Sequence, residues 1–158
     1  MSPLEAELLS LGKISLACIL GGLVGLEREF ADKPAGLRTH MLVCATAAFF
    51  VLLAKIIVNS FEPEGPVSVD PIRLIEAIVV GISFLGAGTI LKYNRERTVE
   101  GLTTSASILS VSAIGIAVAL DAYGLAIGVT LLDLIINWGV NFIAHRIQSA
   151  SNASDTRE

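Results

Sequence analysis

Apolar residues dominate five stretches of this chain, and short polar segments separate them. The stretches cover about residues 8–26, 39–58, 72–91, 102–120 and 124–144. An α-helix rises about 1.5 Å per residue, so about 20 apolar residues cross a hydrocarbon layer of roughly 30 Å. The pattern predicts an all-α bundle of about five transmembrane helices over residues 1–145. A polar tail without stable structure should follow at residues 146–158.

Composition agrees with a membrane protein. The 158 residues are 53% hydrophobic and only 16% charged, with a mean hydropathy of +0.72, whereas a soluble domain carries about 25% charged residues. Glu5 and Glu7 precede the first stretch where a cleaved signal peptide would have basic residues. Cys18 and Cys44 both lie inside apolar stretches, so we expect buried thiols rather than a disulfide.

Lysine and arginine predict the orientation in the membrane. Most of the 11 Lys and Arg residues follow the first, third or fifth stretch. The segment 59–71 instead carries Glu62, Glu64 and Asp70 and has no base before the third stretch begins. Basic loops stay in the cytoplasm. We therefore expect a multi-pass protein of the inner (plasma) membrane, with its N-terminus outside and its C-terminus in the cytoplasm.

A polar break separates the first two apolar stretches. Residues 27–29 (Glu-Arg-Glu) end the first stretch, and residues 34–36 (Pro-Ala-Gly) interrupt the chain before the second. Proline stops a helix and glycine permits a turn, so the two helices should reverse direction and lie side by side. The short loop should let Glu27 and Arg38 form an ion pair at the membrane surface.

The third stretch ends, and the fourth begins, at the same predicted surface. Polar residues at these four helix ends should converge on a cytoplasmic polar rim, which we take as the working site. The predicted rim comprises Glu27, Arg28, Arg38, Thr39, His40, Thr89, Thr103 and Thr104.

Polar residues within the apolar stretches form a second candidate site. A charge at mid-membrane costs about 2.5–3.5 kcal/mol, so each requires a reason. Glu76, Asp133 and Asn137 are the candidates, and Lys13 and Lys55 lie toward the predicted outer surface. One interpretation pairs the lysines with Glu76 and Asp133 and so holds the helices in register. The other is an outward-opening vestibule in which Asp133 binds a cation or a proton.

Small residues should bring the helices together, because helix association in lipid depends on close packing. The glycines selected for this role are Gly21, Gly25, Gly81, Gly86 and Gly88. An alternative role is to bring backbone carbonyl groups close to a permeant ion. The same faces could form a homo-oligomer or contact other membrane proteins.

Motifs of soluble enzymes are missing from the sequence. It has no phosphate-binding loop, no glycine-rich dinucleotide fingerprint and no Cys/His cluster with metal-ligand spacing. We expect no enzymatic activity, no resident cofactor and no nucleic-acid partner, and the pattern leaves any metal site unassigned.

Five blocks of the sequence resemble the signature of the MgtC/SapB family. They are residues 25–29 (GLERE), 34–40 (PAGLRTH), 70–73 (DPIR), 84–90 (FLGAGTI) and 101–104 (GLTT). The resemblance implies a five-span inner-membrane protein associated with growth or survival at low magnesium, with Mg²⁺ as substrate or effector. Two functions stay open: cation transport, and a non-conducting regulatory module that acts on another membrane complex.

The chain also departs from the family pattern. Longer members add a soluble cytoplasmic domain, which we do not expect here. Ser83 and Leu109 stand where glycine and tryptophan are usual, Glu76 replaces a small residue, and Ala77 replaces a glutamine. Asp133 lies outside the five blocks, so the resemblance supports the rim and not Asp133.

Overall fold

The computed structural model describes residues 2–60, 70–92 and 101–155, and these residues form helices without any strand. The helices are α1 (Pro3–Phe30), α2 (Leu37–Ser60), α3 (Pro71–Lys92), α4 (Leu102–Ala119) and α5 (Tyr123–Asp155). Helices α1 to α4 are each long and apolar enough to cross a membrane, and the described apolar part of α5, Tyr123–Gly139, is shorter. The predicted all-α membrane bundle of about five helices is confirmed.

Two helices extend beyond the apolar stretches that predict them. The Ser2 hydroxyl accepts a hydrogen bond from Glu5 N at 3.3 Å, and the Glu5 carboxylate accepts one from Ser2 N at 2.8 Å. This capping box, with Pro3 in the first turn, starts α1 before its apolar part. At the other end α5 continues to Asp155. The boundary expected at residue 146 therefore does not coincide with the end of a helix.

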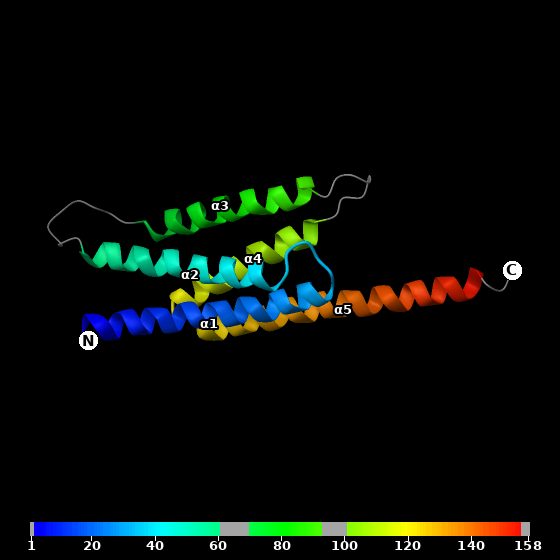
Figure 1. Ribbon diagram of the computed structural model, residues 1–158, viewed down its shortest axis with the longest axis horizontal. Coiled ribbons are helices and arrows are strands. Elements are labelled where there is room, and N and C mark those ends of the chain that lie inside the picture. The colour runs from blue at the N-terminus through cyan, green and yellow to red at the C-terminus, as the bar shows by residue number, and fades with distance from the viewer. Residues whose placement is uncertain (1, 61–69, 93–100, 156–158) are drawn as a thin grey trace.

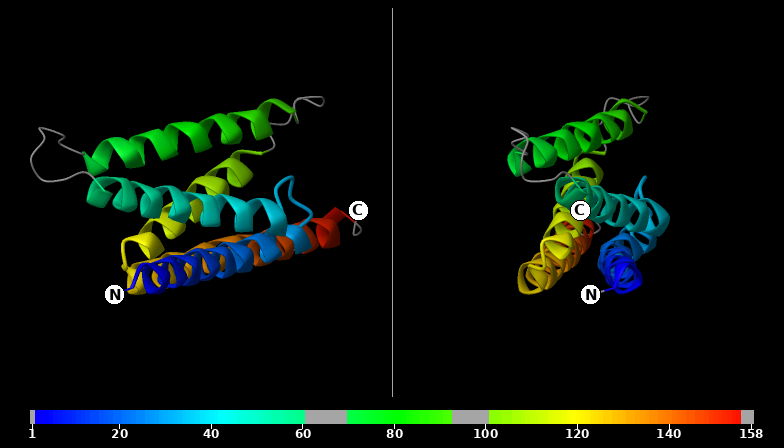
Figure 2. Two further views of the ribbon diagram at one scale, coloured as in Figure 1. Left: turned by 60° about the vertical axis from the view of Figure 1, so that its left-hand side comes forward. Right: turned by 90° about the vertical axis from the view of Figure 1, so that its left-hand side faces the viewer.

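Helix α4 is the centre of the bundle and packs against each of the other four helices. Most of its residues are buried. Figure 1 shows α4 crossing diagonally behind the antiparallel pair of α1 and α2, with α5 beside α1. Helix α3 stands on the far side, where it packs mainly against α4 and hardly touches α2 (Figure 2).

Successive helices run in alternating directions. The α1–α2 turn, the end of α3 and the start of α4 lie at one end of the bundle, and the N-terminus and the α4–α5 turn lie at the other (Figure 1). Because the helices alternate in direction, the predicted rim residues all lie at a single end of the bundle. That this end faces the cytoplasm stays a prediction.

Close approach between helices depends on three glycines in the core. A Cβ atom at Gly21 would lie 2.5 Å from Cys44 Cβ, and one at Gly25 would lie 2.7 Å from His40 Cβ. A Cβ atom at Gly115, which the sequence analysis does not select, would overlap the carbonyl oxygen of Cys44. Helices α1 and α4 therefore both press onto the same turn of α2.

The glycines of α3 are placed differently. A Cβ atom at Gly86 would overlap the hydroxyl of Ser105 on α4, whereas one at Gly81 or Gly88 would meet no atom within 4 Å. Gly86 thus lies at the α3–α4 contact, and Gly81 and Gly88 face open space in this single chain. Both cysteines are free thiols, as expected.

Candidate functional site

Polar side chains gather inside the bundle at the end formed by the α1–α2 turn. They come from α1, α2, α4 and α5, and α4 lies between the others. We term this group the buried polar cluster. Its members are Glu27, Arg28, His40, Ser107, Ser110 and Asp133.

The α1–α2 turn holds two members of the cluster in place. Glu29 accepts a hydrogen bond from Leu37 N at 2.9 Å and so satisfies one of the free N–H groups at the start of α2. Gly36 lies against the same carboxylate, where any Cβ atom would overlap the Glu29 oxygen. These contacts fix Arg28, at the end of α1, relative to His40, in the first turn of α2.

Arg28 is almost fully buried, with 3% of its surface exposed. Its Nε and Nη2 atoms donate to the two Glu27 carboxylate oxygens at 2.5 and 2.8 Å. This two-contact geometry is the strong form of an arginine–carboxylate pair. The expected Glu27–Arg38 pair is corrected by this finding, since Arg38 is exposed. A buried guanidinium requires a counterion far more than an exposed one does.

His40 has no exposed surface and joins α2 to α4. Its Nδ1 lies 2.9 Å from the Gly36 carbonyl oxygen, and its Nε2 lies 2.7 Å from the Ser107 hydroxyl. A carbonyl oxygen only accepts, so Nδ1 carries the proton. In the neutral ring, Nε2 then accepts a hydrogen bond from Ser107.

Asp133 brings a carboxylate from α5 into the cluster. One side of it is hydrogen-bonded to Ser110, and it interacts electrostatically with His40 and Arg28. Its Oδ2 atom is buried and has no hydrogen-bond partner within the described part of the chain. Asp133 is ten residues after the start of α5 at Tyr123. At about 1.5 Å per residue this is about 15 Å, or about half of the hydrocarbon thickness.

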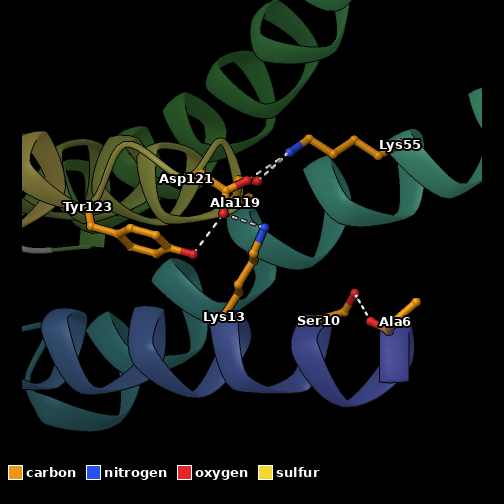
Figure 3. A network of polar contacts seen from close by, with 7 residues as sticks. All are labelled: Ala6, Ser10, Lys13, Lys55, Ala119, Asp121 and Tyr123. Atoms are coloured by element: carbon orange, nitrogen blue, oxygen red, sulfur yellow. Dashed lines mark hydrogen bonds and ion pairs between the residues drawn. The ribbon is translucent and has the colours of Figure 1, made fainter. Parts of the chain in front are cut away.

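The opposite end of the bundle holds a separate polar network at the α4–α5 turn, which we term the lysine–Asp121 clamp. Lys13 Nζ and Lys55 Nζ lie 2.6 and 3.8 Å from the two Asp121 oxygens, approaching from α1 and α2 (Figure 3). Lys55 also donates to the Ala119 carbonyl at 2.6 Å, and the Tyr123 hydroxyl donates to Asp121 at 2.7 Å.

The clamp corrects one interpretation of the intramembrane charges. Lys13 and Lys55 pair with Asp121 and not with Glu76 and Asp133. Asp121 adopts a positive φ of 64°, a conformation that aspartate tolerates better than most residues. Its carboxylate can thereby meet both lysines. The hydrogen bond from Lys13, together with that from Tyr123, holds the pKa of Asp121 below its usual value.

The other predicted site residues divide into buried and exposed groups. Thr104 is buried one turn before Ser107, and its hydroxyl has no partner. Thr89 donates to the Gly86 carbonyl at 2.7 Å within α3. The exposed residues are Arg38, Thr39, Thr103 and Glu76, and Asn137 is half-buried one turn beyond Asp133.

Sequence reasoning did not assign Ser107 to the site. Its signal is the spacing of Thr104, Ser107 and Ser110, which places three hydroxyl groups on one face of α4. The predicted rim included only the first of them. Within the described ranges, no group of three or more His, Cys, Asp or Glu residues could hold a metal ion.

A groove of about 880 Å³ runs between α1 and α5 beside the cluster. Glu27 and Lys33 are its charged wall residues, and the remaining wall is mostly apolar, including Phe30 and Trp138. Glu27 therefore belongs both to the buried cluster and to the wall of a groove that opens at the bundle surface.

Comparison with known proteins matches nearly the whole chain. The model of the MgtC family matches residues 14–146. The chain is 36% identical over 124 residues to the "Putative magnesium transporter YhiD" of Escherichia coli K12, covering 78% of this chain and 57% of that protein. It is 35% identical over 131 residues to the "Protein MgtC" of Salmonella typhimurium LT2, covering 83% and 52%.

A relative from a third organism is also similar. The "Protein SapB" of Bacillus subtilis is 32% identical over 123 residues, covering 78% of this chain and 53% of that protein. The chain thus spans about half the length of the curated relatives it matches. No solved structure matches it at a significant level.

Proposed function

Since this chain belongs to the MgtC family, we propose that it acts in magnesium homeostasis as a multi-pass protein of the inner membrane. The name of the similar Escherichia coli protein, a putative magnesium transporter, supports the link to magnesium. The concentration of basic residues in alternate loops supports the inner membrane and an outside N-terminus.

One observation connects this proposal to particular residues, namely the buried polar cluster. Ionisable side chains inside a membrane protein are costly and usually mark a functional site or a partner. Here Arg28, His40 and Asp133 come from α1, α2 and α5, and the hydroxyl groups of α4 lie between them. A change of charge or ligation in the cluster would therefore act on four helices together.

Cation transport is the finer proposal. Asp133 offers a carboxylate near the middle of the membrane, and its Oδ2 has no hydrogen-bond partner among the residues that the structure describes. Asn137 and the hydroxyl groups of α4 could add oxygen ligands, and Mg²⁺ binds oxygen while retaining several waters. The groove along Glu27 would supply an approach from the α1–α2 end.

A non-conducting regulatory module is the second candidate function. It is favoured by α3, whose outer face exposes Val80 and Phe84 to 70% and 82% and also exposes Glu76. A membrane helix that presents a carboxylate and large apolar side chains away from its own bundle is suited to contact another membrane protein.

Magnesium flux separates the two candidates. Purified protein in liposomes that contain a magnesium-sensitive dye should admit Mg²⁺ if the domain transports, and Asp133→Asn should abolish that flux. Glu76→Gln is the matched control, because it removes a carboxylate that lies outside the cluster. Wild-type protein that supports growth at low magnesium in cells but passes no Mg²⁺ in liposomes would contradict transport and leave the regulatory function.

A further inference from the structure

Asp133 is the carboxylate of the cluster that has no dedicated counterion among the described residues. Arg28 is already held by both oxygens of Glu27. The two lysines that could have neutralised Asp133 are bound to Asp121 at the other end of the bundle. When Asp133 is ionised, the positive charge of Arg28 compensates its negative charge only at longer range. His40 does the same when its imidazole is protonated.

The surroundings of Asp133 make the ionised form costly. Ser110 satisfies one side of the carboxylate, but Oδ2 is buried without a partner. A buried ionised oxygen that lacks hydrogen bonds loses its solvation without replacement. Binding one proton removes the charge and converts the carboxylate into a carboxylic acid, which can donate as well as accept.

His40 offers a second position for the same proton. Its Nδ1–H is engaged by the Gly36 carbonyl, so an added proton would reside on Nε2, which faces Ser107. A serine hydroxyl can donate or accept by rotating. Ser107 can therefore adapt to either state of the imidazole, as Ser110 can to either state of the carboxyl. These two serines are one turn apart on the same face of α4.

We propose that the buried polar cluster binds and releases one proton, held by Asp133 and shared with His40 across the hydroxyl groups of Ser107 and Ser110. Uptake converts the Asp133 carboxylate to the acid, or neutral His40 to imidazolium, and the charge of the cluster rises by one. Arg28 and Glu27 face the same space from α1 as an ion pair.

A proton can bind at this site without the further ligands that a metal cation requires. It needs a single acceptor, whereas Mg²⁺ requires several oxygen ligands in octahedral geometry. Arg28 is close enough to Asp133 to interact with it electrostatically, and its positive charge opposes a divalent ion more strongly than a proton. The inference goes beyond the proposed function, because a protein that moves no magnesium can still take up this proton.

Infrared difference spectroscopy of the purified protein tests the proposal directly. A protonated carboxylic acid has a carbonyl stretch that the carboxylate lacks. Between about pH 5 and about pH 9, where exposed carboxyl groups stay ionised, wild type should show such a band that appears as pH falls. Asp133→Asn should remove the band, and Glu76→Gln should retain it.

A second variant keeps the test decisive if Asp133→Asn does not fold. Ser110→Ala deletes the hydrogen bond to the carboxyl and should move the midpoint of the band to higher pH, because that bond stabilises the ionised form. Absence of any such band in folded wild-type protein would overturn the proposal, and so would a band of constant intensity across the range. None of these outcomes depends on magnesium flux or growth.

Discussion

Replacing Gly115 by alanine tests the close contact between α2 and α4 on which the position of the cluster depends. The added Cβ atom would overlap the Cys44 carbonyl oxygen and would lie 3.2 Å from Ala47 Cβ. The first contact is with backbone, so no side-chain rotation relieves it, and the two helices must separate. Forcing extra atoms into a packed core costs about 1–3 kcal/mol.

The gain in helix propensity offsets part of this cost. Alanine is favoured over glycine in a helix by about 1 kcal/mol, so we expect Gly115→Ala to lower the free energy of unfolding by up to about 2 kcal/mol. Gly128→Ala on α5 is the matched control, because its Cβ atom would meet nothing within 4 Å. It should be neutral or slightly stabilising.

The two variants can be compared by unfolding them with SDS in mixed micelles. Unfolding is followed by far-UV circular dichroism and by the fluorescence of the single tryptophan, Trp138. Gly115→Ala should unfold at a lower SDS fraction than wild type, and Gly128→Ala should not. Equal stability of the two variants would refute the inferred contact between α4 and the backbone of α2.

Three further predictions concern the two ends of the bundle. Asp121→Asn should destabilise the protein near neutral pH. The lowered pKa of Asp121 means that this group stabilises the folded state only while it is ionised. The difference in melting temperature between the variant and wild type should therefore vanish as pH falls from about 4 through that pKa. Ser107→Ala should lower the free energy of unfolding by about 1–3 kcal/mol in SDS titrations, since it leaves the buried Nε2 of His40 without its partner. In a variant without native cysteines, an impermeant thiol reagent on intact cells should label Tyr123→Cys and not Lys33→Cys, and the reverse result would contradict the predicted orientation.

The helices could be predicted from the sequence because their cause is local. About 20 consecutive apolar residues imply a membrane-spanning helix wherever the partners lie, and Pro34 and Gly36 mark the turn between the first two helices. Alternation of the helices then brings the predicted rim to one end of the bundle. The residues of the MgtC/SapB signature predicted the family, because the signature consists of short blocks that can be read directly from the sequence.

The pairing of charges could not be predicted in the same way, because it depends on helix rotation and on which turns meet. One interpretation of the sequence pairs Lys13 and Lys55 with acids inside other helices, but the α4–α5 turn places Asp121 between the two lysines. Glu27 was predicted to pair with Arg38, but it pairs with Arg28, because Arg28 faces the interior of the bundle. Small shifts in rotation decide both outcomes.

The exclusion of Asp133 from the working site had a different origin. Asp133 lies outside the family blocks, so the resemblance did not link this carboxylate to the rim. The tertiary contacts connect the two, since Asp133 interacts with His40 and Arg28, which belong to those blocks. The rim and the intramembrane acid thus meet in one cluster.

Growth at low magnesium of cells that depend on this protein tests most directly whether the buried polar cluster is its working site. Asp133→Asn keeps the size of the side chain and removes its charge, and Glu7→Gln does the same for an exposed carboxylate near the start of α1. With both variants present in the membrane at the wild-type level, we predict that Asp133→Asn fails to support growth and that Glu7→Gln supports it fully. Full growth with Asp133→Asn at that level would contradict the assignment of the working site.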